Sequence, residues 1–279
     1  MERLFVLVRG INDVGSAVAH RLFNDGHAVA IHDMPAPTTT RRRMAFADAL
    51  FDGAAELEGV RAVRIYRAND MTKLLEAHEV LPVFAGRLAP LRAALGWEVI
   101  IDARMRKRSR GEDQRALAPL TIGLGPGFVA GEHVDVAIET SWESLGAIVD
   151  EGPTLPLRGE PRPLGGHGRD RYVYAPVAGR FATERAIGER VEAGTVLAHV
   201  AGTPLAAPLG GAIRGLVRDG VRIRRGTKAI EIDPRGTDAE VTGIGERPRA
   251  IANAVKQAIE TRWPSIRERA PYARGPATP

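Results

Sequence analysis

The sequence predicts an α/β fold in which a parallel-sheet domain is followed by a small all-β domain and a C-terminal helix. Strand-like apolar runs alternate with helical segments over the first half, a β pattern repeats with a constant offset later on, and helical periodicity follows it. The 279 residues suffice for two compact domains. The expected boundaries are 1–150 for the α/β domain, 151–170 for a linker or excursion, 171–236 for the β domain, 237–263 for the helix and 264–279 for a disordered tail.

Composition narrows the classes of function. Cysteine is absent, which excludes disulfides, thiol nucleophiles, cysteine metal sites and persulfide carriage. The net charge of +5 is modest, and no basic module accompanies it, so no nucleic-acid partner is expected. No apolar run approaches the roughly 18 residues of a membrane span, and the first residues lack the pattern of a signal peptide. We therefore expect a cytoplasmic protein without a membrane partner.

A Rossmann-like βαβ unit opens the chain. Residues 4–8 form an apolar run typical of a strand buried on both faces, 16–24 have helical periodicity, and 28–31 form a second strand. In the glycine turn between strand and helix, Gly10 allows the tight bend and Gly15 lets the helix approach the strand.

This turn predicts a nucleotide site. The helix N-terminus would offer N–H groups to a phosphate, and Asp33, about 20 residues on, would accept hydrogen bonds from a ribose. Asn12 replaces the middle glycine of the pattern, and Asp13 would suit a metal-bound phosphate or a helix cap better than a bare phosphate. The alternative is a scaffold whose glycines only make the turn.

A basic segment follows the second strand. Residues 38–43 are expected to open an amphipathic helix that runs through Phe51, with a threonine as its N-cap. Arg41 and Arg42 at the start of a helix oppose its dipole, which indicates an anionic partner. The alternative is a solvated basic turn.

The remaining α/β elements lead to a second group of candidates. Strands are predicted over 60–66, 80–84 and 98–102, and short helices over 70–78 and 87–95. Asp102 ends a buried strand, where ligands of open α/β sheets bind, so the candidates here are Asp102, Arg104 and Lys107. Alternatively, the basic stretch 104–110 is a surface loop.

A glycine-rich loop precedes the last predicted strand of this half, residues 134–140. Gly123, Gly125 and Gly127 occupy alternate positions, and their uncovered N–H groups could wrap an anion or admit a flat ligand. A tight corner between strands is the alternative.

The β domain is built on a repeat. Residues 175–179 (APVAG) recur as 207–211 (APLGG), and the turn glycines and apolar positions after them match at the same offset. Two such units interlocking into a flattened barrel resemble the biotinyl/lipoyl barrel-sandwich hybrid domain, whose carriers hold the cofactor on a hairpin lysine. The corresponding hairpin, 200–205, contains no lysine, and Lys228 is not equivalent. No covalent biotin or lipoate is expected. The C-terminal helix is predicted over 248–262.

Several short strings together resemble a known family over the chain up to about residue 262; they lie at 8–10, 13–15, 19–22, 42–46, 122–128, 138–140 and 233–236. This family is the selenium-dependent molybdenum hydroxylase system protein family of the YqeB type. The resemblance implies an accessory protein that helps to mature a molybdenum hydroxylase of the xanthine dehydrogenase kind or supplies its cofactor, with an N-terminal part similar to xanthine dehydrogenase accessory proteins. It carries over no catalytic residues.

Three functions remain open at this point. The first is an accessory protein that binds a nucleotide of the NAD type or the molybdopterin cofactor, with a molybdenum hydroxylase as partner. The second is an NAD(P)-dependent oxidoreductase, against which stands the lack of a convincing proton-transfer residue, since the seven histidines are scattered. The third is a docking protein for a hydroxylase.

Overall fold

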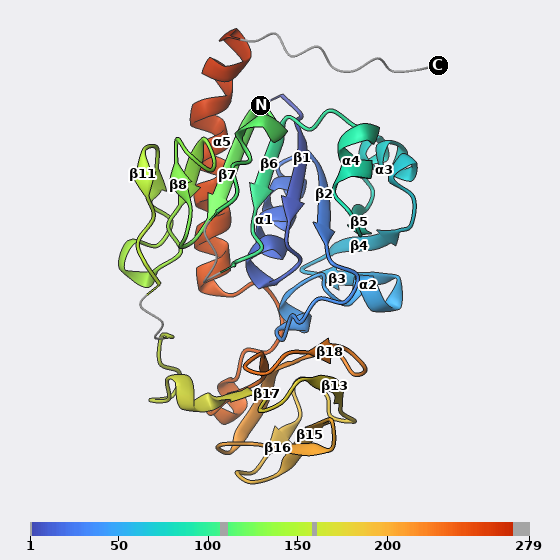
Figure 1. Cartoon of the computed structure of the whole chain (residues 1–279), viewed down its shortest axis with the longest axis vertical. Coiled ribbons are helices and arrows are strands. Elements are labelled where there is room, and N and C mark those ends of the chain that lie inside the picture. Colours follow the sequence, from blue (N-terminus) through green and yellow to red (C-terminus); the bar gives the residue numbers. More distant parts are fainter. Residues whose placement is uncertain (1, 107–110, 158–160, 270–279) are drawn as a thin grey trace.

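The structure, a computed structural model, describes residues 2–106, 111–157 and 161–269. An α/β module built on one large sheet lies above a small β module (Figure 1). The carboxyl ends of the central strands, with Arg9 at the end of β1 and Asp33 at the end of β2, lie on the side that faces the β module (Figure 1). The mixed α/β character and the C-terminal helix agree with the prediction.

The large sheet has nine strands in the order β10-β9-β7-β6-β1-β2-β5-β4-β3. Its seven inner strands are parallel, and the edge strands β3 and β10 run antiparallel to their neighbours. The chain builds the β2 side first and then returns to place β6 against β1. The strands are β1 Phe5–Arg9, β2 Ala28–Asp33, β3 Ala54–Leu57, β4 Val60–Ile65, β5 Leu81–Ala85, β6 Val99–Asp102, β7 Leu120–Leu124, β9 Val136–Ile138 and β10 Ile148–Val149.

Helices cover both faces of this sheet. One core joins alternate strand residues to α1 (Asp13–Asn24) and α5 (Glu246–Arg269). The other core packs the intervening residues against α3 (Met71–Ala77) and α4 (Ala89–Ala94). Burial on both faces explains why the central strands read as continuous apolar runs in the sequence. A minor two-stranded sheet joins β8 (Val129–Ala130) to β11 (Gly152–Pro153).

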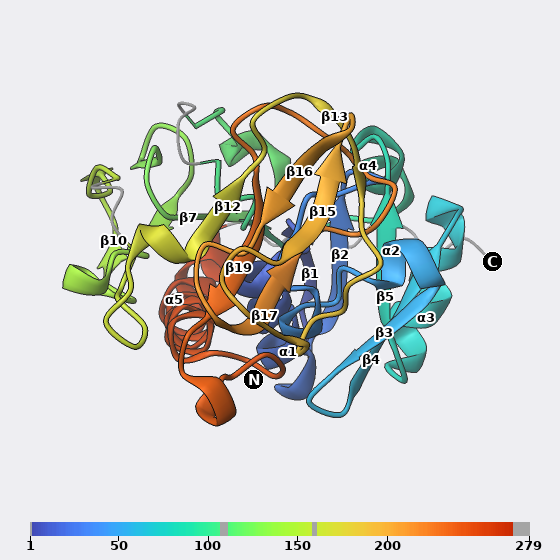
Figure 2. The same ribbon diagram turned by 90° about the horizontal axis from the view of Figure 1, so that it is seen from below.

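The β module contains two four-stranded sheets around one apolar core. Their orders are β12-β19-β17-β14 and β16-β15-β13-β18. Figure 2 shows this module from below, in front of the large sheet. The strands are β12 Tyr172–Tyr174, β13 Gly179–Ala182, β14 Arg190–Val191, β15 Val196–Val200, β16 Thr203–Ala206, β17 Gly211–Leu216, β18 Arg222–Ile223 and β19 Lys228–Asp233.

The sequence repeat is visible in the strands. β13, β14 and β15 start at 179, 190 and 196, and β17, β18 and β19 start 32 positions later, at 211, 222 and 228. β13 pairs with β18, and the equivalent β17 pairs with β14, so each half completes the sheet of the other. The predicted interlocking of two β units is therefore present. The assignment to the barrel-sandwich hybrid class stays a prediction.

Three local predictions differ from the structure. Residues 38–51 do not form one helix; a 3₁₀ turn Arg42–Met44 and the short α2 (Ala49–Asp52) stand there. The backbone at Thr40 instead accepts a hydrogen bond from the Leu216 N–H of the β module, which draws the segment out of helical geometry. Strand β3 was not predicted.

The third difference concerns the end of the chain. Helix α5 continues to Arg269, past Pro264 and into the predicted disordered tail. Trp263 is buried and Ile266 packs on the same core, so apolar contacts extend the helix in spite of the proline. Residues 270–279 lie outside the described part of the chain. Within the described ranges, no helix combines the length and apolarity needed to cross a bilayer.

Replacing Gly15 by alanine tests the close contact between α1 and the glycine turn. A Cβ there would lie 1.9 Å from the Gly10 carbonyl oxygen. Alanine normally favours a helix, but this backbone clash should lower the free energy of unfolding by about 3 kcal/mol. Urea unfolding measures the loss. Gly210→Ala is the control, because its Cβ would lie 3.6 Å from the nearest atom; equal stability of the two variants would contradict the contact.

Candidate functional site

The glycine turn after β1 is filled by the protein itself. A Cβ at Gly10, where φ is +119°, would lie 2.6 Å from the Ala103 carbonyl oxygen. Asn12 Nδ2 donates to that same oxygen at 2.7 Å. The crevice between the ends of β1 and β6, where open α/β sheets bind ligands, is therefore occupied by residue 103. Both glycines have the packing roles expected of them.

The first turn of α1 is capped internally. Asn12 Oδ1 accepts hydrogen bonds from the N–H groups of Val14 (3.0 Å) and Gly15 (3.2 Å). The expectation that these groups are open to a phosphate is wrong, because the Asn12 side chain occupies the position of an N-cap acceptor. The Asp33 carboxylate also has partners within the protein, since it accepts hydrogen bonds from the N–H groups of Ile11 and Met34, each at 2.7 Å.

Asp102 organises the neighbouring loop. Its carboxylate accepts from Arg104 Nε at 2.9 Å and from Gln114 Nε2 at 2.8 Å. Burial would raise its pKa, but the hydrogen bond and charge of Arg104 outweigh burial and lower it. A carboxylate used in this way holds loop residues in place and has little capacity left for a ligand. Lys107 lies outside the described residues.

The glycine-rich loop is a packed corner. A Cβ at Gly123 would lie 2.5 Å from the Phe128 ring, and one at Gly125 would lie 2.8 Å from Thr140 Oγ1. The Gly127 carbonyl accepts from the Gly111 N–H at 2.9 Å. Side chains thus fill the space beside Gly123 and Gly125, and Gly127 pairs with backbone, which favours the corner interpretation over an anion-binding loop.

The two arginines after β2 have anionic partners within the chain. Arg42 Nη1 donates to both carboxylate oxygens of Asp48, at 2.6 and 2.7 Å. Arg41 donates to both oxygens of Glu231 at 3.0 and 2.9 Å and to Asp13 at 2.9 Å. Because Glu231 belongs to β19, the Arg41 guanidinium joins the start of α1 to the β module. The predicted anionic partner of Arg41 and Arg42 is therefore the protein's own carboxylates.

Charged side chains gather around this junction. Glu231 has no exposed side-chain surface and receives hydrogen bonds from Arg41, Arg171 and Lys228, while Arg214 Nε lies 3.6 Å from it. Four cations thus share one carboxylate. We call the whole group the interface cluster; it consists of Asp13, Arg41, Arg171, Arg214, Lys228, Glu231, Asp233, Arg235 and Arg247.

Positive charge is in excess in the interface cluster. It contains six cations and three carboxylates; Arg235, paired with Asp233, is also acted on by Glu240 and Asp238 outside the cluster, which help to raise its pKa. Arg247 donates to the Thr140 carbonyl at 2.7 Å, and among the described residues no carboxylate forms an ion pair with it. Arg171 Nε is buried without an acceptor, and Arg214 Nε faces the Glu231 carboxylate at 3.6 Å without a hydrogen bond. Unpaired buried donors of this kind favour the binding of an anion.

The crowded charges and the burial of the interface cluster also shift the pKa values of Glu231 and Lys228. Burial would raise the pKa of Glu231, but Lys228 and Arg41 outweigh it and hold the value well below the usual range. Burial, opposed by Glu231 and assisted by Arg41, lowers the pKa of Lys228. Side-chain exposure of 31% at Lys228 and about a fifth at Asp13 and Arg41 leaves the cluster reachable from solvent.

Sequence reasoning missed most of this cluster. Arg41 and Asp13 were candidates, but Glu231, Arg171 and Arg247 were not. A usable signal was the strand Ile230-Glu231-Ile232-Asp233, which places two carboxylates in an apolar run where burial demands a cationic partner.

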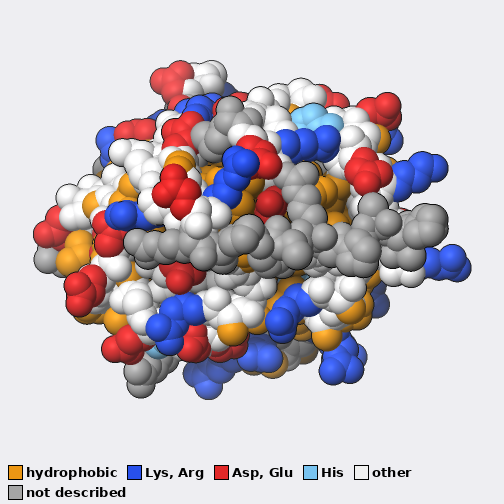
Figure 3. Space-filling view, turned by 90° about the horizontal axis from the view of Figure 1, so that it is seen from above, with side chains coloured by type: hydrophobic (Ala, Val, Ile, Leu, Met, Phe, Trp, Pro, Cys, Tyr) orange, Lys and Arg blue, Asp and Glu red, His pale blue; other side chains and the backbone are white. Residues whose placement is uncertain are grey.

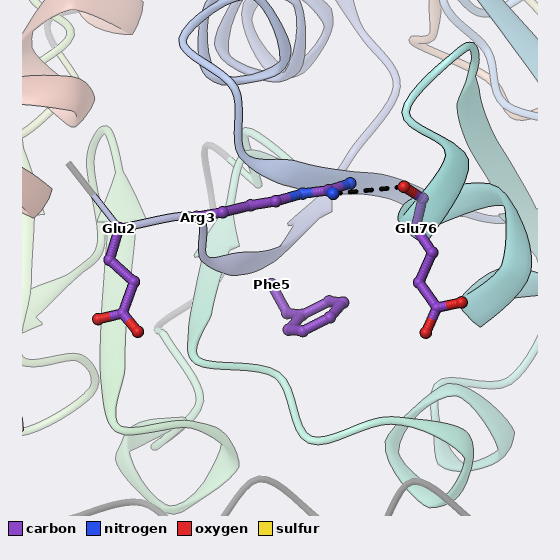
Figure 4. A pocket seen from close by; sticks show the side chains of 4 residues that line it. All are labelled: Glu2, Arg3, Phe5 and Glu76. Atoms are coloured by element: carbon purple, nitrogen blue, oxygen red, sulfur yellow. Dashed lines mark hydrogen bonds between the residues drawn. The ribbon is translucent and has the colours of Figure 1, made fainter. Parts of the chain in front are cut away.

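Two surface hollows, each of about 370 Å³, lie away from the interface cluster. One is at the amino ends of the strands and is lined by Glu2, Arg3, Phe5 and Glu76, with Arg3 donating to the Glu76 carbonyl at 3.3 Å (Figure 4). The other lies at the surface where α1 and α5 meet, and its lining includes His20, Arg21 and Asn253. On the face seen from above, acidic and basic side chains are interspersed without a large field of one sign (Figure 3). Within the described ranges no group of three metal-ligating side chains occurs.

The chain is similar in sequence to a known protein of Escherichia coli. No family model matches the chain. It is 35% identical over 257 residues to the uncharacterized protein YqeB of Escherichia coli (strain K12), a match that covers 91% of this chain and 47% of the relative. The expected similarity to YqeB is thus confirmed at this level. The chain spans about half the length of that protein.

The solved structures are only distantly similar. An aspartoacylase family protein of Mesorhizobium loti shares 12% identity over 73% of this chain and 56% of its own, with a TM-score of 0.23. A succinylglutamate desuccinylase of a Silicibacter species shares 14% identity over 83% and 85%, with a TM-score of 0.24. Similarities this low carry no argument about fold or function.

Neutralising Glu231 tests its place in the interface cluster. Glu231→Gln leaves four buried or half-buried cations without their common counter-charge, and removal of one partner from a buried ion pair typically costs about 3–5 kcal/mol. Urea unfolding should show a loss of that size. Glu189→Gln, which breaks the partly exposed pair with Arg185, is the matched control and should change stability by less than about 0.5 kcal/mol.

The lowered pKa of Asp13 predicts that the stability of the protein depends on pH. Burial would raise its pKa, but Arg41, Lys228 and Arg247 together lower it. A depressed pKa contributes stability that is full above the unfolded value of about 4 and is lost as pH falls toward the folded value. The free energy of unfolding of Asp13→Asn should therefore fall less steeply between about pH 6 and pH 3 than that of the parent chain. Asp150→Asn, at a half-exposed pair with Arg262, should keep the parent slope.

Proposed function

We propose that this chain is an accessory protein that binds a phosphate-bearing cofactor at the interface cluster and serves the maturation or cofactor supply of a molybdenum hydroxylase. The observation that carries the proposal is the surplus of cations in the interface cluster: it holds six cations and three carboxylates, and the buried Arg171 Nε has no acceptor.

An anion at this place is physically favourable. Lys228 and Arg247 both lie close enough to Asp13 to lower its pKa, so they approach the start of α1 from the β module and from α5. Both cations are themselves disfavoured by burial. A phosphate near them would supply the counter-charge that Asp13 and Glu231 provide only in part, and arginine and lysine together suit phosphate recognition.

The link to molybdenum hydroxylases rests on the family resemblance of the short strings and on the similarity to YqeB. The family resemblance suggests the partner enzyme, whereas the class of ligand is inferred from the charges of the interface cluster. Molybdopterin cofactor and a nucleotide of the NAD type both carry phosphate, and both remain ligands for this proposal. Because the chain spans about half of YqeB, the proposal concerns this chain and not the activity of the longer protein.

The alternative functions have less support in the geometry. An NAD(P)-dependent oxidoreductase would need the glycine turn to receive a pyrophosphate, and Asn12 and Ala103 occupy that space. A docking protein for a hydroxylase would need no ligand at the interface cluster, so a ligand-binding experiment separates it from the first proposal.

Calorimetry on the whole chain tests the proposal. Molybdopterin cofactor and NAD are titrated separately, and Lys228→Met should weaken binding of the preferred ligand by about tenfold, since one charge-assisted hydrogen bond is lost. Lys256→Met is the control, because Lys256 pairs with Glu260 on α5 away from the cluster; its affinity should equal that of the parent. Absence of binding by both ligands would overturn the proposal and favour a docking role.

A further inference from the structure

A row of polar side chains crosses the carboxyl ends of the central strands, outside the interface cluster. Arg9 of β1 is in register with Asp102 of β6 on one side and with His32 of β2 on the other. Side chains in register on parallel strands point to the same face of the sheet. The row therefore lies on the face that α3 and α4 cover, above the apolar residues two positions earlier on each strand, Leu7, Ala30 and Ile100.

On the Asp102 side of this row, the carboxylate already accepts hydrogen bonds at both of its oxygens. Gln114 donates to Asp102 Oδ2 at 2.8 Å and accepts from Arg9 Nη1, and Arg104 Nε donates to both Asp102 oxygens at 2.9 and 3.1 Å. These contacts hold Arg9 in place through one of its nitrogens. They leave Arg9 Nε, which is buried and has no acceptor. An arginine Nε always carries a hydrogen, so it is an unused donor.

His32 presents the complementary group. Its Nε2 lies 2.9 Å from the Gly86 carbonyl oxygen, and because a carbonyl only accepts, Nε2 carries the hydrogen. Burial lowers the pKa of His32, with Arg9 and Arg104 adding to the effect, so the ring is neutral near pH 7. Nδ1 then has a bare lone pair, and this atom is buried without a partner. Phe84 stacks on the ring and helps to fix it.

A structural role explains Arg9 Nη1 and His32 Nε2 but leaves Arg9 Nε and His32 Nδ1 without a partner. Arg9 is 6% exposed and His32 is 8% exposed, so both unpaired atoms carry the cost of a buried polar group. Two neighbouring strands thus supply one unused donor and one unused acceptor at the edge where α/β sheets bind ligands. Charge adds a preference: burial and the nearby Arg104 lower the pKa of Arg9 to about 10, and an anion would relieve that repulsion.

We propose that Arg9 and His32 form a binding site for a small oxyanion that carries an adjacent hydroxyl group. Arg9 Nε donates to the anionic oxygen, and the ligand hydroxyl donates to His32 Nδ1. A 2-hydroxycarboxylate and a singly protonated phosphate share this chemistry. The site uses none of the residues of the interface cluster, so it stands or falls independently of the proposed function.

Matched small probes test the site on the whole chain. Calorimetry with glycolate, acetate and inorganic phosphate compares ligands with and without the hydroxyl donor. Glycolate should bind about tenfold more tightly than acetate, since acetate leaves the buried Nδ1 unsatisfied. Tighter binding of phosphate than of glycolate would assign the site to protonated inorganic phosphate, and the reverse to a hydroxy acid. Equal affinities of glycolate and acetate, or no binding by glycolate and phosphate, would overturn the proposal.

A variant and a spectroscopic readout complete the test. His32→Phe keeps a ring against Phe84 but removes the acceptor, and should abolish the preference for glycolate over acetate. His199→Phe, at an exposed position of β15, should leave it unchanged. If His32→Phe does not fold, the ¹⁵N signal of Nδ1 in the parent chain decides: it should shift on addition of glycolate and stay in place with acetate. An Nδ1 signal that glycolate does not move would refute the site.

Discussion

The carboxylate of Glu231, buried without exposed surface and shared by four cations, is the interaction on which the arrangement of the two modules depends. A single buried charge is costly unless it is paired, so this carboxylate requires Arg41 from the α/β module as well as Arg171 and Arg214 from its own. Arg41 in turn binds Asp13 at the start of α1. The β module is thereby joined to the helix that follows the first strand.

The same requirement explains the shape of the segment between β2 and β3. Thr40 accepts a backbone hydrogen bond from Leu216, and Arg42 donates to the Leu216 carbonyl at 2.9 Å. These contacts extend β17 toward the α/β module and leave no room for the helix that the local sequence favours. Charge pairing and backbone hydrogen bonding across the interface outweigh a helix propensity of a few tenths of a kcal/mol per residue.

The glycine turn and the interface cluster show how a familiar sequence pattern can serve packing here. Gly10 and Gly15 allow β1, α1 and residue 103 to approach each other, and Asn12 satisfies the helix N-terminus from within. The buried polar atoms that lack a hydrogen-bond partner therefore lie elsewhere, and these are the groups on which we base both proposed ligand sites. These are the guanidinium groups between the modules and the Arg9–His32 pair at the strand ends.

The sequence by itself determined the elements whose signal is local. Continuous apolar runs predicted the central strands, the 32-residue offset predicted two interlocking β units, and helical periodicity predicted α1 and α5. Only the tertiary structure decided which charges meet, because Asp13, Arg41, Arg171 and Glu231 are far apart along the chain and their contacts depend on how the two modules dock. It also decided that Asp33, Asp102 and the glycine-rich loop are internally satisfied, since hydrogen-bond partners such as Ile11 and Gln114 cannot be assigned from spacing alone.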